Sequence, residues 1–203
     1  MSKANIVSKF ALNKTQVAKV DYYLSSIIKY NKHTNLVGKS TIENIWERHV
    51  LDCLQLTKYI ANKKFKILDL GTGAGLPGVL LSIAGYQRVL MVDSVKKKTD
   101  FVSQIIKDLS LTAKIQNKRI EKPPISKHDI IVSRALAPLD KLLTYARMYS
   151  NKNTTSLFLK GRNVISEIDI ATKVYFFEFE KIKSLSSDDG CILKIINIKN
   201  KNG

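Results

Sequence analysis

The stretch "ILDLGTGAGLPGVLL", residues 67–81, decides the fold. An apolar run ends near an acidic residue, a glycine-rich loop follows, and a second apolar run begins. Asp69, Gly71, Gly73 and Gly75 match the D-x-G-x-G-x-G loop that holds S-adenosylmethionine, but the glycines from Gly73 onward also match the G-x-G-x-x-G loop of nicotinamide enzymes. Both signatures predict a strand, a tight turn and a helix, with bare backbone that approaches a nucleoside ligand closely.

The segments around this loop alternate between strand and helix patterns. The predicted strands cover 65–70, 88–92, 113–117, 129–133 and 155–159, and amphipathic segments cover 77–84, 94–109 and 138–150. This alternation is typical of βαβ units and a parallel sheet. Two more β-rich segments, 173–184 and 191–199, are joined by "LSSDDG" and predict an antiparallel hairpin.

The hairpin favours the methyl donor over the dinucleotide. Dinucleotide folds continue with parallel βα units, whereas S-adenosylmethionine methyltransferases typically close a seven-stranded, mostly parallel sheet with an antiparallel hairpin. We therefore predict an α/β, Rossmann-like class I methyltransferase domain over 61–203. Apolar residues at helical spacing over 15–30 and 41–60 predict an N-terminal helical extension over 1–60.

The charge balance points to a polyanionic partner. The 203 residues include 34 Lys and Arg against 17 Asp and Glu, for a net charge of +17. This excess favours nucleic acid before an anionic membrane, although the many lysines also fit a solvated surface. No apolar stretch approaches the roughly 18–20 residues of a membrane span, and we expect no secretory signal. Two distant cysteines and three scattered histidines predict reduced thiols in a cytoplasmic protein and no metal site.

Acidic residues end the first two predicted strands. A carboxylate at Asp69 suits a positively charged sulfonium better than a pyrophosphate. Asp93 follows Gly71 by 22 positions (93 − 71), where an acid accepts hydrogen bonds from ribose hydroxyls. The alternative role for Asp93 is to cap the helix that follows, a position for which Ser94 is a second candidate.

The loops after the third and fourth strands complete the predicted donor site. In this fold the third loop often meets adenine, so we expect Ile120 to pack on the ring and Glu121 to meet the exocyclic amine, unless Glu121 is a surface acid. Arg134, in "SRALAP" (133–138), is either a ligand or phosphate contact or a solvent-exposed group at a helix start.

Basic and N-terminal residues are candidates for RNA contact. Cations in the first turn of a helix oppose its macrodipole, so Lys96, Lys97 and Lys98 favour an external anion over a solvated helix face. The segment "WERHVLD" (46–52) places Trp46 and His49 on one helical face. We expect that face either to be buried against the catalytic domain or to contact RNA directly.

Methyl transfer is an in-line displacement in which the protein mainly aligns donor and acceptor. A pyrimidine C5 acceptor needs a cysteine nucleophile, commonly after proline, and an exocyclic amine commonly needs an (Asp/Asn)-Pro-Pro-(Tyr/Phe) motif after the fourth strand. Cys53 follows Asp52, Cys191 follows Gly190, and the fourth strand ends in Ser-Arg-Ala. A ring nitrogen such as guanine N7 has no proton to remove, and it fits a chain without an acid–base constellation.

Several motifs occur together over 35–161: "NLVG", "WERHVLDCL", "ILDLGTGAGLPGVLLSI", "VDSVKKKTDFV", "SRALAPL" and "FLKG". In this order and spacing they resemble the RsmG (GidB) family of bacterial 16S ribosomal RNA guanine-N7 methyltransferases. Leu136 stands where that family often has phenylalanine.

The resemblance implies a donor site and a target, the guanine at position 527 of 16S rRNA in the small ribosomal subunit. With the fold logic, it gives these donor-site residues: Asp69, Gly71, Gly73, Gly75, Leu76, Asp93, Ile120, Glu121 and Arg134. The candidate RNA contacts are Arg48, His49, Lys96, Lys97, Lys98, Arg119 and Lys160. We expect a monomer that uses S-adenosylmethionine. The alternatives are a nicotinamide-dependent oxidoreductase and a non-catalytic RNA-binding module.

Overall fold

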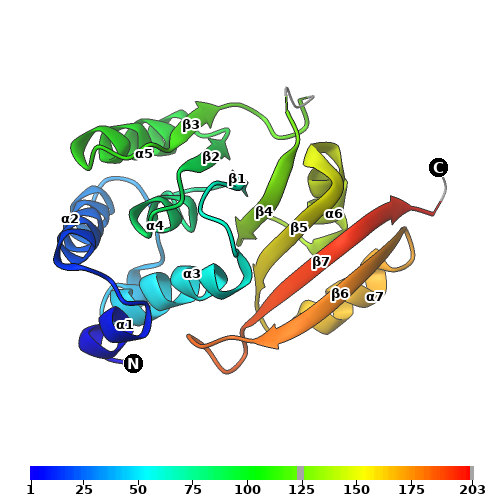
Figure 1. Ribbon diagram of the computed structural model, residues 1–203, viewed down its shortest axis with the longest axis horizontal. Helices are drawn as coiled ribbons and strands as arrows, with labels where there is room; N and C mark the ends of the chain where they lie inside the picture. Colours follow the sequence, from blue (N-terminus) through cyan, green and yellow to red (C-terminus); the bar gives the residue numbers. More distant parts are fainter. Residues whose placement is uncertain (123–125, 202–203) are drawn as a thin grey trace.

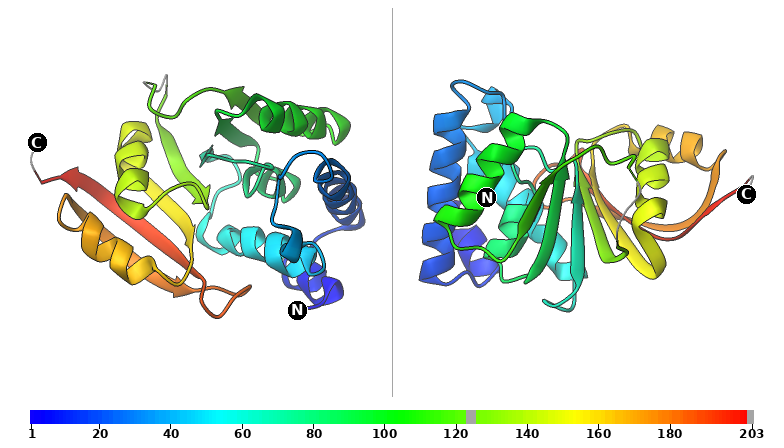
Figure 2. Two further views of the ribbon diagram at one scale, coloured as in Figure 1. Left: turned by 180° about the vertical axis from the view of Figure 1, so that it is seen from behind. Right: turned by 90° about the horizontal axis from the view of Figure 1, so that it is seen from above.

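The computed structural model describes residues 1–122 and 126–201, which form a seven-stranded sheet with helices on both faces (Figures 1 and 2). The strands are β1 (Lys66–Leu70), β2 (Arg88–Asp93), β3 (Lys114–Asn117), β4 (His128–Arg134), β5 (Ser150–Lys160), β6 (Tyr175–Lys183) and β7 (Cys191–Asn200). The longer helices are α1 (Lys3–Lys9), α2 (Lys14–Tyr30), α4 (Gly78–Ile83), α5 (Lys96–Asp108), α6 (Leu139–Tyr149) and α7 (Val164–Ala171). The short helical turns are η1 (Lys39–Thr41), η2 (Trp46–Leu51), α3 (Asp52–Leu54) and η3 (Gln55–Tyr59).

The strand order is β3-β2-β1-β4-β5-β7-β6. The first five strands are parallel, and β7 runs antiparallel to its neighbours β5 and β6. The seven predicted strands and the closing antiparallel hairpin are confirmed, although β5 begins at Ser150 rather than at residue 155. Because the strand order changes direction between β1 and β4, the carboxyl ends of these strands flank the crevice in which such sheets bind ligands.

Helices cover both faces of the sheet, and the central strands β1 and β4 are accordingly buried. One hydrophobic cluster lies on the side of α2, α4 and α5 and includes Tyr23 and Met91. A second cluster lies on the side of α6 and α7 and includes Leu143 and Phe158. The right-hand view of Figure 2 shows these two helical layers on opposite sides of the strands.

The N-terminal segment contributes to the core of the sheet. A capping box at Asn13 and Gln16 starts α2, close to the start predicted from the apolar spacing. Ile27 and Leu51 belong to the same hydrophobic cluster as residues of the central strands. This cluster spans the division predicted between residues 60 and 61, and the division itself stays a prediction. Within the described ranges, no helix has the length and apolar character that a membrane crossing needs.

Two helical predictions differ from the structure. The segment 41–60 is not one regular helix, because η2 is a π-helical turn that continues into the α-helical α3 and the 3-10 turn η3. Helix α7 is missing from the predicted helices. It has exposed apolar residues, Ile165 and Ile170, as well as buried ones, and this obscures the helical period.

The buried side chain of Tyr23 connects α2 to the glycine loop that follows β1. Its hydroxyl donates a hydrogen bond of 2.9 Å to the carbonyl oxygen of Ala74, and the residue has no exposed surface. A Cβ atom at Gly75 would lie 3.2 Å from the same hydroxyl oxygen. The N-terminal segment therefore supports the glycine loop from inside the protein.

We expect Tyr23→Phe to lower the free energy of unfolding by about 1–2 kcal/mol, because the buried carbonyl of Ala74 loses its partner. Urea unfolding measures this change. Tyr22→Phe is the matched control, since the Tyr22 hydroxyl bonds to Asp108 at the surface, and its expected change is below about 0.5 kcal/mol. Equal losses in the two variants would contradict the role of Tyr23.

Candidate functional site

The carboxylate of Asp69 closes the glycine loop between β1 and α4. Asp69 Oδ2 accepts hydrogen bonds from the Thr72 hydroxyl and, at 2.9 Å, from the amide of Gly78. The amide of Gly73 donates to Asp93 Oδ2 at 2.9 Å. These bonds fix the loop at the carboxyl ends of β1 and β2, where the sequence predicted the donor site.

The environment of Asp69 corrects its predicted role. The residue is fully buried, and its Oδ1 has no hydrogen-bond partner in the part of the chain that the structure describes. Burial raises the pKa of Asp69 to about 7, although the bonds from Thr72 and Gly78 act in the opposite direction. Asp69 therefore holds the loop from within. Its charge does not decide between a sulfonium and a pyrophosphate.

Three glycines give the loop its shape and leave one open position. Gly71, Gly73 and Gly75 have positive φ values, which favour glycine. A Cβ atom would lie 2.4 Å from Leu136 at Gly71, and 2.5 Å from Val79 at Gly75. At Gly73 the nearest atom, the Gly71 carbonyl oxygen, would be 4.0 Å away. Position 73 thus faces open space, and this bare backbone fits the close approach of a nucleoside-bearing donor.

Asp93 lies at the end of β2, as predicted, and is mostly buried. Its Oδ1 accepts a hydrogen bond of 2.8 Å from the amide of Val95, and its Oδ2 accepts the bond from Gly73. Both oxygens therefore organise local backbone. Each carboxylate oxygen keeps a further lone pair, and the ribose contact stays a prediction.

The other residues predicted to meet the donor differ in exposure. Ile120 and Leu76 are buried in the two hydrophobic clusters. Glu121 is exposed, and its Oε1 accepts a hydrogen bond of 3.1 Å from the Tyr145 hydroxyl. A bond from its own backbone and then the bond from Tyr145 lower the pKa of Glu121. Donor contacts at these three positions stay predictions.

A cavity of about 780 Å³ lies at the carboxyl ends of β4 and β5. It is lined by η2, α3, the loop 134–138, residues 159–163 and the hairpin loop between β6 and β7. Leu136 belongs to this lining and also covers Gly71, which lies in the glycine loop. The cavity therefore adjoins the predicted donor loop, with Leu136 at the boundary.

Arg134, at the end of β4, binds the N-terminal segment. Its Nε forms an ion pair of 3.1 Å with Asp52 Oδ2, its Nη1 donates to His49 Nδ1 at 2.8 Å, and its Nη2 donates to the carbonyl oxygen of Arg48 at 3.1 Å. These bonds anchor η2 to the sheet beside the cavity. Arg134 also lines the cavity, and its predicted donor contact stays a prediction.

Asp52 also binds the hairpin loop. Its Oδ1 accepts hydrogen bonds from Ser186 Oγ at 2.6 Å and from Gln55 Nε2 at 3.1 Å. The Gln55 side-chain oxygen in turn accepts a bond of 2.8 Å from the amide of Leu185. Gln55 and Ser186 carry no local signal in the sequence, because no short pattern relates side chains that meet across distances such as the 134 positions between Asp52 and Ser186.

His49 is buried and neutral, with 3% of its surface exposed. Because Arg134 donates to Nδ1, the imidazole proton lies on Nε2, which bonds to Thr41 Oγ1 at 2.8 Å. Burial, followed by the charges of Arg134 and Arg48, lowers the pKa of His49 to about 3. This placement corrects the predicted RNA contact at His49 and confirms the alternative, burial.

Lys160 is held inside the cavity wall. Its Nζ lies 2.5 Å from Glu167 Oε2 and donates to the carbonyl oxygen of Ala137 at 3.1 Å. The same Glu167 oxygen accepts a bond of 2.8 Å from the amide of Leu139, the first residue of α6. Only 9% of the Lys160 side chain is exposed, so the ion pair positions α6 and leaves little of the charge for RNA.

Of the remaining predicted RNA contacts, Arg48 lines the cavity, and the other four lie outside its lining. Lys96 and Lys97 are exposed, Lys98 is half-buried, and Lys96 pairs with Asp100 at 2.5 Å. Arg119 is exposed after β3. These residues follow the carboxyl ends of β2 and β3, on the donor-loop side of the crevice, and RNA contact there stays a prediction.

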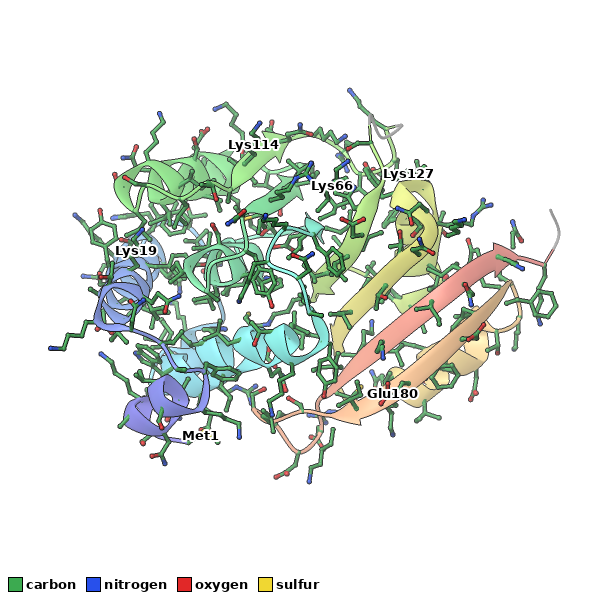
Figure 3. The ribbon with its side chains drawn as sticks, viewed as in Figure 1. Met1, Lys19, Lys66, Lys114, Lys127 and Glu180 are labelled. Atoms are coloured by element: carbon green, nitrogen blue, oxygen red, sulfur yellow. The ribbon has the colours of Figure 1, made fainter. Side chains whose placement is uncertain are left out.

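Basic residues also lie at the amino ends of the parallel strands, opposite the candidate site. Lys66 begins β1, Arg88 begins β2, Lys114 begins β3, and Lys127 directly precedes β4. Figure 3 labels the three lysines along one side of the molecule. The net charge of +17 is therefore not confined to the candidate site.

We expect His49 to stay neutral until the pH falls to about 4, because its pKa of about 3 lies below the ordinary 6.5. The stability that this group contributes is present above pH 6.5 and is lost as the pH falls toward 3. Nitrogen-15 NMR of labelled histidine should show the Nε2–H tautomer. A proton on Nδ1, or a titration midpoint near 6.5, would contradict the assigned hydrogen bonds.

Solved structures share the fold of this chain. A TehB-like SAM-dependent methyltransferase from Corynebacterium glutamicum has a TM-score of 0.56 at 19% identity, over 72% of this chain and 87% of that chain. A mutant of MtNAS in complex with S-adenosylmethionine has a TM-score of 0.62 at 13% identity, over 90% of this chain and 76% of that chain. The Rossmann-like class I methyltransferase fold is confirmed.

Sequence comparisons identify the family. The GidB family model, described as rRNA small subunit methyltransferase G, matches residues 16–191. Ribosomal RNA small subunit methyltransferase G of Cereibacter sphaeroides is 36% identical over 200 residues, which cover 96% of this chain and 97% of that protein. The protein of the same name from Orientia tsutsugamushi is 38% identical over 189 residues, 93% of this chain and 92% of that protein. This chain belongs to the GidB family of rRNA small subunit methyltransferases.

Proposed function

We propose that this chain transfers a methyl group from S-adenosylmethionine to N7 of a guanine, position 527, in the 16S rRNA of the small ribosomal subunit. It acts in the cytoplasm, as a monomer. Membership of the GidB family sets aside the oxidoreductase and the non-catalytic RNA-binding module that the glycine loop and the charge left open.

The observation that carries the proposal is the position of Leu136 between the glycine loop and the cavity. On one side it covers Gly71, and on the other it lines the cavity at the ends of β4 and β5. A donor at the open face of Gly73 and an acceptor base in the cavity would meet beside this side chain. Such proximity is the main contribution that a protein makes to an in-line displacement.

The side chains near the site fit an acceptor that needs neither nucleophile nor base. Burial raises the pKa values of Cys53 and Cys191, which keeps both as thiols. His49 is neutral, but both of its ring nitrogens are occupied by hydrogen bonds. In the described ranges, no cluster of His, Cys, Asp and Glu is suited to a metal ion. Guanine N7 presents a lone pair without a proton, so alignment with the donor methyl group is sufficient.

Purified protein incubated with labelled S-adenosylmethionine and unmodified small subunits should place one methyl group on 16S rRNA. Primer extension after N7-specific cleavage should map it to guanine 527. Label in protein, or on a pyrimidine or an exocyclic amine, would refute the assigned acceptor.

We expect Gly73→Val to weaken donor binding at least about tenfold, because the new side chain occupies the open face of the loop. Calorimetry with S-adenosylmethionine measures the affinity. Gly85→Val is the matched control. Gly85 also has a positive φ, +96°, and a Cβ there would meet nothing within 4 Å, but it lies beyond α4. The same affinity in both variants would place the donor elsewhere.

A further inference from the structure

Seven charged side chains line the cavity at the ends of β4 and β5, and four of them neutralise one another. Arg134 pairs with Asp52, and Lys160 pairs with Glu167. Two cations and one anion remain, and within residues 1–122 and 126–201 their side chains form no ion pair or hydrogen bond. The three are Arg48, Arg162 and Asp189.

These three groups come from separate parts of the cavity wall. Arg48 lies in η2, Arg162 follows β5, and Asp189 lies in the hairpin loop between β6 and β7. All three are exposed, so they are accessible to a ligand that enters from solvent. The bonds of Asp52 tie η2, which carries Arg48, to both the sheet and the hairpin loop, which carries Asp189.

The charges fit the chemistry of a guanine nucleotide within an RNA strand. Arginine pairs well with phosphate oxygens, and each target nucleotide is flanked by two phosphates. An ionised carboxylate only accepts hydrogen bonds, and guanine presents two neighbouring donors, N1–H and the exocyclic amine, on its Watson–Crick edge. N7 lies on the other edge of the base, and it stays free when the Watson–Crick edge is bound.

We propose that the cavity binds the target nucleotide through these three groups, an inference that rests on the proposed function. Arg48 and Arg162 hold the phosphates on either side of it, and Asp189 accepts hydrogen bonds from N1–H and the exocyclic amine of its guanine. Arg134 and Lys160 are positioning residues of the cavity wall. Arg162 and Asp189 were not among the residues that the sequence motifs singled out.

The phosphate contacts can be tested by RNA binding. Arg48→Gln and Arg162→Gln should each weaken binding to unmodified small subunits roughly fivefold near physiological salt. Each should also reduce the slope of log affinity against log salt concentration by about 0.7–1. Arg88→Gln is the matched control, because Arg88 is an exposed arginine at the start of β2, away from the cavity, and its slope should equal that of the wild type. The affinity for S-adenosylmethionine should not change in any of the three.

The base contact can be tested with subunits whose target guanine is replaced by inosine, which lacks the exocyclic amine. The wild type should prefer guanine by roughly five- to a hundredfold in kcat/KM. In Asp189→Ala this preference should fall toward one, because no side-chain oxygen remains to accept from the amine. Asp188→Ala is the matched control: Asp188 is fully exposed, lies outside the cavity lining, and its variant should keep the wild-type preference.

The outcomes separate this inference from the proposed function. If the wild type binds S-adenosylmethionine but does not methylate guanine, the proposed function fails. If the wild type methylates guanine while Arg48→Gln and Arg162→Gln match Arg88→Gln, the phosphate contacts are overturned. If Asp189→Ala keeps the wild-type preference for guanine over inosine, the base contact is overturned. Circular dichroism of each variant confirms that the measured protein is folded.

Discussion

The site depends on the ion pair and hydrogen bonds that the carboxylate of Asp52 forms. This carboxylate binds Arg134 at the end of β4 and Ser186 in the hairpin loop, and it belongs to the N-terminal segment. Both side chains of the ion pair are mostly buried, 21% exposed for Arg134 and 16% for Asp52. Removing one partner would leave the other charge poorly solvated, which lowers the stability of the fold strongly. Replacing both partners by apolar residues of similar volume would change the stability much less. Through the bonds to Arg134 and Ser186, Asp52 therefore fixes the relative positions of three segments that lie far apart in the sequence: the N-terminal segment, the end of β4 and the hairpin loop.

Two buried titratable groups, Asp69 and His49, change the stability of the fold with pH in opposite directions. The pKa of Asp69 is raised to about 7, so the stability it contributes is present below the ordinary 3.8 and is lost as the pH rises through 7. His49 has a lowered pKa and loses its contribution as the pH falls from 6.5 toward 3. The windows overlap between about pH 4 and 6.5, where the two effects partly cancel. Both groups serve the architecture of the site, one under the glycine loop and the other under Arg134.

Much of the fold could be predicted from the sequence because its determinants are local. Short apolar runs, the glycine loop and the turn "LSSDDG" each encode their own element, and the order of the elements encodes the topology. Gly71, Gly73 and Asp93 also lie together where their strands end, as their positions in the sequence suggested, and donor binding at this loop stays a prediction. The departure from regular helical pitch over 41–60 could not be predicted, because side chains such as Gln55 bond there to residues of the hairpin loop.

Three residues predicted to contact ligands also have partners inside the protein. Arg134 was assigned to the donor, and Lys160 and His49 to RNA, yet each forms an ion pair or hydrogen bond within the chain. Sequence position shows that a charge is present. It does not show whether another part of the chain already neutralises that charge. Burial likewise could not be predicted for Asp69 from the sequence. Its raised pKa depends on the residues packed around it, which no sequence motif describes.

The insertion of β7 between β5 and β6 has a consequence for biosynthesis. During translation β5 emerges before β6, but its outer edge, the one not paired with β4, pairs with β7, so this edge stays open while the intervening residues are added. An unpaired edge of this kind is prone to intermolecular association until its partner strand arrives. The hairpin loop is completed in the same step, so the nascent chain acquires the full cavity wall only after this late strand has been inserted into the sheet.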